Sequence, residues 1–243
     1  MLCRVAVLSD IHHGRLLTES GAPGPPSGKE LLDEAVSCLN LQIAPDLVLV
    51  LGDLVDAGDT EAGMGCLRAL RPALDRLAAP VLVLPGNHDP APEAFYAVFT
   101  RPPAWLDAGG VRFVPFVDPE APEFNAFRPA EALSRFAQAR EGFSGPLVSL
   151  QHVPLFAPGA SDCPYNYTNA EEILQAMAAC GAGCAISGHY HKGVNIIDGS
   201  GLVSIVAPAL CQAPYRFLEL RFSDSALAVQ ERTLPLSQHA PGA

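Results

Sequence analysis

The first ninety residues alternate short apolar runs with longer segments in which apolar residues recur at helical spacing. Continuous Val- and Leu-rich runs separated by helices are typical of parallel strands that are covered on both faces. Ser27 and Glu30 have the spacing of a capping box, which predicts the start of the first helix. The predicted elements are strand Leu2–Leu8, helix Lys29–Gln42, strand Asp46–Leu51, helix Ala62–Ala78 and strand Val81–Leu84.

The remainder of the chain is richer in short strand candidates than in helices. Two helices are predicted, at Pro129–Arg140 and at Asn169–Cys180, and the second is opened by Thr168 and closed by Gly181. Many strands with few helices indicate a second, mixed sheet packed on the first. The strand candidates are Val111–Val117, Pro146–Gln151, Cys184–Ser187, Gly193–Ile197, Leu202–Val206, Phe217–Phe222 and Leu227–Arg232.

Polar motifs directly follow the first three predicted strands, at Ser9–His12, Gly52–Asp56 and Gly86–Asp89. Loops that follow parallel strands lie at one edge of a sheet, where ligands bind. We therefore expect these three loops to converge in space, an arrangement that packing alone does not explain. The Gly- and Pro-rich segment Gly21–Gly28 predicts a surface loop over the same site.

Composition narrows the class of protein. A chain of 243 residues with 49% apolar and 17% charged residues can bury one sizeable core, so we expect a single domain over residues 1–235 and a tail over 236–243. The net charge of −11, without a cluster of Lys or Arg, argues against a nucleic-acid partner. It does not argue against a small phosphate compound, because bound cations reverse the local sign of the field.

Cellular context is predicted from two absences in the sequence and from the pattern of its cysteines. No apolar run is long enough to span a bilayer, and the N-terminus has no charged leader with a cleavage site. The seven cysteines are scattered and odd in number, which fits reduced thiols, most of them buried. We therefore expect a cytoplasmic protein with no membrane partner, acting on a small-molecule phosphoester.

Histidines provide the candidate chemistry. Five of the seven end strand-like runs beside Gly, Asp, Asn or another His: His12, His88, His152, His189 and His191. With Asp10, Asp53 and Asn87 they form a set of nitrogen and oxygen donors that suits Mn, Fe or Zn.

The number of candidate ligands favours two ions over one. Seven ligands are too many for a single ion that keeps an open position, and Asp53 follows a strand and a glycine, so it is the natural carboxylate to be shared. Two cations about 3.5–4 Å apart would lower the pKa of a shared water to about 7 and so supply hydroxide at neutral pH.

Five motifs in a fixed order carry a family resemblance. They are Asp10-x-His12, Gly52-Asp53-x-x-Asp56, Gly86-Asn87-His88-Asp89, a lone His152 after a strand, and Gly188-His189-x-His191. This set, over residues 9–191, resembles the calcineurin-like metallophosphoesterases, and among them the small bacterial phosphodiesterases similar to cyclic-nucleotide phosphodiesterases.

The resemblance implies a fold and an activity. The fold is a four-layer α/β/β/α sandwich of two mixed sheets flanked by helices. The activity is hydrolysis of phosphomonoesters or phosphodiesters of small molecules, nucleotides among them, by a metal-bridging hydroxide. The implied cofactors are two divalent transition-metal ions, with manganese as the first candidate and iron and zinc as alternatives.

The resemblance also implies a role for each motif residue. His88 is not a ligand but the general acid that protonates the leaving group, and Asp89 orients it. Asp53 bridges the ions. The first ion is bound by Asp10, His12 and His191, and the second by Asn87, His152 and His189.

Other polar side chains receive weaker assignments from the sequence. Candidate substrate contacts, each with a loop or solvent-facing alternative, are His13, Tyr165, Asn166 and Arg128. Asp56 and Asp59 are interpreted as caps or loop residues rather than ligands.

Two other functions compete with the phosphoesterase. One is a binding scaffold of the same fold that has lost catalysis, and the complete ligand set with His88 argues against it. The other is a nuclease, and the absence of basic segments argues against that activity.

Overall fold

The first sheet of the computed structural model has five strands in the order β13-β12-β1-β2-β3. Strands β1, β2 and β3 pair in parallel, β12 joins β1 antiparallel, and β13 continues from β12. Their bounds are β1 Cys3–Leu8, β2 Leu47–Leu51, β3 Val81–Leu84, β12 Arg216–Phe222 and β13 Leu227–Thr233. The structure describes residues 3–15, 25–197, 201–223 and 226–236.

The second sheet has six strands in the order β10-β11-β9-β8-β5-β4. Its four central strands are parallel, and β10 and β4 pair antiparallel at the two edges. The strands are β4 Leu106–Ala108, β5 Val111–Pro115, β8 Leu147–Leu150, β9 Cys184–Ser187, β10 Val194–Ile197 and β11 Val203–Val206. A separate small hairpin pairs β6 (Glu120–Ala121) with β7 (Asn125–Ala126).

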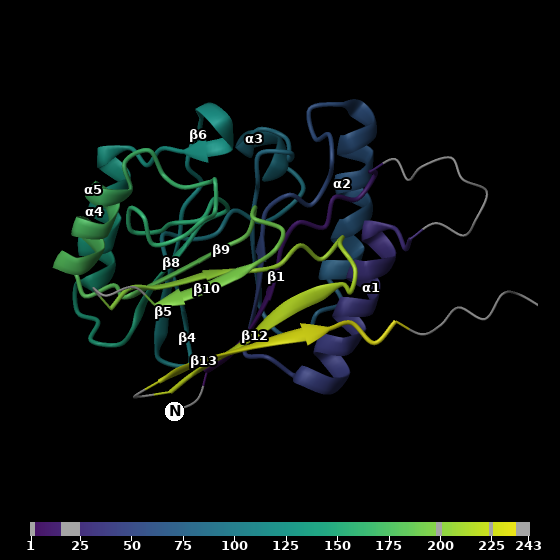
Figure 1. Ribbon diagram of the computed structural model, residues 1–243. Helices are drawn as coiled ribbons and strands as arrows, with labels where there is room; N and C mark the ends of the chain where they lie inside the picture. Colours follow the sequence, from purple (N-terminus) through teal and green to yellow (C-terminus); the bar gives the residue numbers. More distant parts are fainter. Residues whose placement is uncertain (1–2, 16–24, 198–200, 224–225, 237–243) are drawn as a thin grey trace, which may run out of the picture.

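Helices cover the outer faces of both sheets (Figure 1), with α1 and α2 on one side and α4 and α5 on the other. Their bounds are α1 Gly28–Cys38, the π-helical turn η1 Leu39–Ile43, α2 Glu61–Leu74, α3 Pro92–Phe95, the short η2 Pro122–Phe124, α4 Ala130–Arg140 and α5 Ala170–Ala179. None of the helices in the described ranges is long and apolar enough to cross a membrane.

Successive side chains along a strand point to opposite faces of the sheet, and this alternation explains the layers. In β2, Leu47, Leu49 and Leu51 face the second sheet, whereas Val48 and Val50 pack in the layer with α1 and α2. A third apolar layer lies between the second sheet and helices α4 and α5. The predicted four-layer sandwich of two mixed sheets is therefore confirmed.

Most predicted elements are found within a few residues of their predicted bounds. Ser27 caps α1 as a complete capping box, with the Ser27 hydroxyl 3.3 Å from the Glu30 amide nitrogen. The second predicted helix is shorter than expected, because α2 ends at Leu74. The predicted strand Val111–Val117 ends at Pro115, which leaves Val117 exposed.

The predicted cap of the last helix is wrong. Asn169, not Thr168, is the residue before α5, and neither supplies a capping hydrogen bond. The Thr168 hydroxyl instead donates to the Ala126 carbonyl at 3.4 Å, which ties this segment to β7. Gly181 ends the helix in the left-handed conformation, as predicted.

Several short elements carry no periodic signal and were not predicted, namely α3, β4 and the β6–β7 hairpin. All seven cysteines are free, but only Cys3, Cys38 and Cys184 are buried, so the expectation that most are buried is wrong. Half of the predicted loop Gly21–Gly28, residues 21–24, and all of the tail 236–243 except Leu236 lie outside the described residues.

Candidate metal centre

The carboxyl ends of strands from both sheets meet at one place. The loops after β1, β2 and β3 converge there with those after β8 and β9, and together they bring all seven predicted ligands into one group. Four of those residues have left-handed backbones, which are uncommon for residues other than glycine and typical of functional sites: Asp10 (φ 55°), His12 (φ 45°), Asp53 (φ 53°) and His189 (φ 68°).

Glycines in the motifs allow this close convergence. A Cβ on Gly52 would collide with the His152 ring, and one on Gly86 would collide with the Asp53 carboxylate. A Cβ on Gly188 would overlap the side chain of Ser9. These three glycines are therefore required by backbone approach rather than by flexibility alone.

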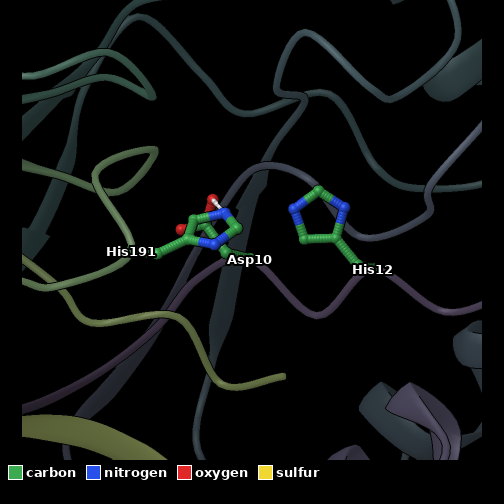
Figure 2. A group of neighbouring side chains, drawn as sticks. All are labelled: Asp10, His12 and His191. Atoms are coloured by element: carbon green, nitrogen blue, oxygen red, sulfur yellow. Dashed lines mark ion pairs between the residues drawn. The ribbon is translucent and has the colours of Figure 1, made fainter. Parts of the chain in front are cut away.

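The first cluster comprises Asp10, His12 and His191 (Figure 2). Oδ1 of Asp10 lies 3.4 Å from Nε2 of His191, and the rings of His12 and His191 are 5.2 Å apart between centroids. Asp10 and His12 are almost completely buried, whereas the His191 side chain is 28% exposed. Three potential ligand atoms thus surround one space that is open to solvent beside His191.

The second cluster comprises Asp53, His152 and His189, with Asn87 beside it. Nε2 of His152 lies 3.2 Å from both Oδ1 of Asn87 and Nδ1 of His189. Two ring nitrogens that face each other at this distance can share a proton or a cation.

A single carboxylate oxygen joins the two clusters. Oδ2 of Asp53 lies 3.6 Å from Nε2 of His12 and 3.4 Å from Nε2 of His152. The other oxygen, Oδ1, accepts a hydrogen bond from the His88 backbone N–H at 2.9 Å, which fixes the carboxylate plane. Asp53 therefore has the position required of a bridging ligand.

Partners behind the histidines set their orientation. Nδ1 of His152 donates to the Leu51 carbonyl at 2.7 Å, and Nδ1 of His12 lies 3.2 Å from the Asp56 carboxylate. Nδ1 of His191 lies 2.7 Å from the side-chain amide of Gln212. Metal-binding histidines are held in this way by a second hydrogen bond on the far ring nitrogen.

Buried atoms at the centre fit a cation. Among the described residues, no hydrogen bond reaches the buried Oδ1 of Asp10 or the buried Nε2 of His12. Unpaired buried polar atoms are rare and destabilising unless a ligand fills them. The mixed nitrogen and oxygen donors suit a transition-metal ion.

Electrostatics inside the cluster favours ligand-ready protonation states. Burial lowers the pKa of His12. Burial, together with the charge of the neighbouring His152, lowers the pKa of His189 to about 4, so the rings of His12 and His189 are both neutral at pH 7. Burial opposes the charged forms of His152 and Asp53, but their mutual attraction outweighs it. The pKa of His152 rises to about 9, and that of Asp53 falls below its usual range. A cation at this position would replace the proton on His152.

The family model for calcineurin-like phosphoesterases matches residues 3–193. The chain belongs to the calcineurin-like phosphoesterase family. No curated protein sequence matches it.

Solved structures share the fold at low sequence identity. A dimetal phosphatase from Danio rerio is 15% identical with a TM-score of 0.78, over 95% of this chain and 96% of that one. A purple acid phosphatase from yellow lupin seeds is 14% identical with a TM-score of 0.65, over 96% of this chain and 52% of that one. GAP50, described as the anchor in the inner membrane complex of Plasmodium, is 10% identical with a TM-score of 0.60, over 96% and 85%. These likenesses show the fold alone.

Histidine 88 occupies the exposed edge of the phosphoesterase centre. Its ring lies 4.9 Å from the His12 ring, and its Nδ1 is 2.9 Å from the Asp56 carbonyl oxygen. The prediction that Asp89 orients His88 is wrong. The Asp89 carboxylate instead accepts hydrogen bonds from the backbone N–H groups of Leu54, Val55 and Gly86, so it joins the loop after β2 to the loop after β3.

Arg128 is not a substrate contact. Its guanidinium is completely buried, pairs with Asp118 and stacks on the Phe116 ring at 3.6 Å. The sequence predicted an accessible Arg128, but the side chain is buried. The Asn166 side chain is also engaged, because it bonds the backbone of Phe156 and Tyr167.

Two candidate substrate contacts keep their place near the ligands. The Tyr165 ring lies 4.5 Å from the His189 ring, at the margin of the second cluster. His13 follows the first cluster in the chain, and its backbone N–H donates to the Leu54 carbonyl. Sequence reasoning missed Asp56 and Gln212 as partners of ligand histidines; the only signal for Asp56 was its place in the Gly52–Asp56 motif.

Proposed function

We propose that the protein hydrolyses phosphoester bonds of small molecules with two divalent metal ions. The observation that carries the proposal is the position of Asp53 Oδ2, between Nε2 of His12 and Nε2 of His152 at 3.6 and 3.4 Å. One carboxylate oxygen between two groups of nitrogen and oxygen donors is the arrangement of a two-metal hydrolase.

The donors divide between the two ions. Asp10, His12 and His191 would hold one ion, Asn87, His152 and His189 would hold the other, and Asp53 would bind both. Manganese is the first candidate, with iron and zinc as alternatives, because the donors are imidazole, carboxylate and amide without thiolate. Bound cations would supply a water ionised near neutral pH and would polarise the phosphoryl oxygens.

His88 is the group proposed to deliver a proton to the leaving oxygen. The Asp56 carbonyl fixes one proton on Nδ1, so the second proton of the charged ring resides on Nε2. The side chain is exposed at the edge of the centre, where an entering ester can reach it. The proposal assigns it proton transfer rather than metal binding.

Turnover with defined metals tests this function. Mn²⁺-loaded protein should hydrolyse p-nitrophenyl phosphate or its bis ester, and a chelator should abolish the reaction. Turnover of protein loaded with Fe²⁺ or with Zn²⁺, compared with that of the Mn²⁺-loaded protein, shows which metal supports the reaction best. Absence of turnover on a broad panel of phosphoesters at full metal loading would refute the proposal.

The competing functions give different outcomes. A folded protein that never acquires metal would support a binding scaffold, although the chain keeps every ligand of the five motifs. Strong DNA binding with a steep salt dependence would support a nuclease, against a net charge of −11.

A further inference from the structure

A cavity of about 420 Å³ opens beside the second cluster. Asn87 and His152, both of the second cluster, are among its lining residues. Its walls come from the segment after β5, from the β6–β7 hairpin and from Tyr167. A phosphate held at the metal centre would therefore direct one of its substituents into this cavity.

The cavity is mainly apolar and contains no cationic side chain. Phe116, Val117, Phe124 and Val153 contribute to its walls, with several prolines. None of the described lining residues is Lys or Arg. The parts of the sequence outside the described residues also contain no Lys and no Arg. A second phosphate or a carboxylate in the cavity would have no protein cation to pair with.

Asp118 is one of the polar residues that line the cavity. Its side chain is only 4% exposed. Oδ2 accepts hydrogen bonds from Nε and Nη2 of Arg128, at 3.0 and 2.8 Å, and from the Tyr167 hydroxyl at 2.7 Å. No hydrogen bond to Oδ1 occurs in the described part of the chain, so this oxygen has no donor there.

Charge differs between the two ends of the metal centre. Glu120 lies exposed on the wall of the cavity and adds a negative charge there. At the other cluster, Lys192 follows His191 and Arg15 lies within electrostatic reach of His191. The Arg135 guanidinium lies 4.7 Å over the Phe116 ring but does not line the cavity. An anionic substituent is therefore disfavoured on the cavity side.

We propose that this cavity binds the organic part of a single-phosphate ester, an apolar group that is neutral or cationic and offers an O–H or N–H donor to Asp118. The proposal rests on the proposed function for the position of the phosphate. It excludes substrates whose organic part bears a further phosphate or carboxylate.

Calorimetric titration with inert phosphonates tests the preference without requiring turnover. The Mn²⁺-loaded protein is titrated with 4-carbamoylphenylphosphonate and with 4-carboxyphenylphosphonate, which have the same size but differ in charge. The carbamoyl compound should bind about tenfold more tightly or better, because like charges repel in a confined site. Equal affinities, tighter binding of the carboxylate, or binding of neither compound would overturn the proposal.

A matched pair of charge reversals localises the effect. Glu120→Lys should reduce the preference at least about fivefold, whereas Glu123→Lys, on the same exposed hairpin but outside the cavity lining, should change it less than about twofold. Equal effects of the two variants would also overturn the proposal. Failure of phosphoester turnover with the binding preference intact would instead count against the proposed function alone.

Discussion

Two clusters of buried polar side chains differ in how their hydrogen bonds are filled. Around Arg128, the guanidinium bonds Asp118, Ser149, Gln151 and Tyr167, so each charge has a partner. At the candidate metal centre, by contrast, several buried side-chain atoms have no hydrogen bond within the described part of the chain.

Some buried atoms at the candidate metal centre have no hydrogen-bond partner. In the described residues, Asp10 Oδ1 and His12 Nε2 have no hydrogen bond, and Nε2 of His152 faces Asn87 Oδ1 and His189 Nδ1. Breaking a buried ion pair leaves an uncompensated charge, whereas buried polar atoms without a hydrogen bond are explained by a bound ion or ligand. The comparison therefore separates a cluster whose charges are paired within the protein from one that fits a cation, although both are buried.

The largest effect is expected for Asp53→Asn, which removes the shared charge between the clusters. Turnover should fall about 10⁴-fold, because several kcal/mol of charge stabilisation leave with the ions. Metal analysis of the purified variant should show loss of bound metal. A variant with full metal content and full activity would contradict the role of Asp53 as the carboxylate shared by the two ions.

Arg128→Met should destabilise the fold by about 3–5 kcal/mol, because Asp118 is left buried without its charge partner. Urea unfolding in the presence of chelator measures the effect apart from metal binding. Arg135→Met is the matched control, since that guanidinium also lies over the Phe116 ring, at 4.7 Å, but its hydrogen bonding among the described residues is limited to the Ala104 carbonyl. The control should lose about 1 kcal/mol; equal losses would contradict the role of the Arg128 cluster.

His88→Ala should keep both ions and lower turnover about 10²-fold. The loss should grow with the basicity of the leaving group, because a poor leaving group depends most on protonation. A series of aryl and alkyl phosphates measures this dependence. A uniform loss across the series would argue against His88 as the acid.

Asp56→Ala should weaken metal binding roughly 10- to 100-fold, because Asp56 holds Nδ1 of His12. Competition with a metal-sensitive dye gives the affinity. Asp59→Ala in the same loop serves as the control, and it should bind metal as the unmodified protein does. A similar loss of metal affinity in both variants would contradict a specific role for the contact between Asp56 and His12, because it would indicate a general disturbance of the loop.

Glu219→Gln should have the smallest effect, about 1.5 kcal/mol at pH 7. Glu219 is buried and accepts hydrogen bonds from Arg221 and Arg232; burial opposes its charge, but these arginines outweigh burial and lower its pKa. A lowered pKa stabilises the fold above the usual value of 4.5, and this contribution is lost as pH falls through the pKa of the folded state. The stability difference from the unmodified protein should therefore shrink below pH 4.5. A constant difference across that range would be inconsistent with this linkage.

The convergence of the candidate metal ligands was predictable because they follow strands that the apolar pattern reveals. Asp10, Asp53 and Asn87 come after continuous apolar runs, and parallel strands bring such ends together. The layered fold follows from the same runs. Neither inference required contacts between distant residues to be known.

The remaining features depend on tertiary contacts that no local pattern encodes. Arg128 looked like a surface cation because burial is decided by helix packing around it. Asp89 adjoins His88 in sequence, yet its carboxylate turns to the loop after β2. Gln212 reaches His191 from a segment without any motif. The β6–β7 hairpin was missed because strands of two residues show no periodicity.

Anomalous diffraction from crystals of the Mn²⁺-loaded protein most directly tests whether Asp53 joins two cations. Two peaks are predicted, one on each side of the Asp53 carboxylate: the first beside Asp10, His12 and His191, the second beside Asn87, His152 and His189. A single peak, or peaks that do not contact Asp53, would contradict the account.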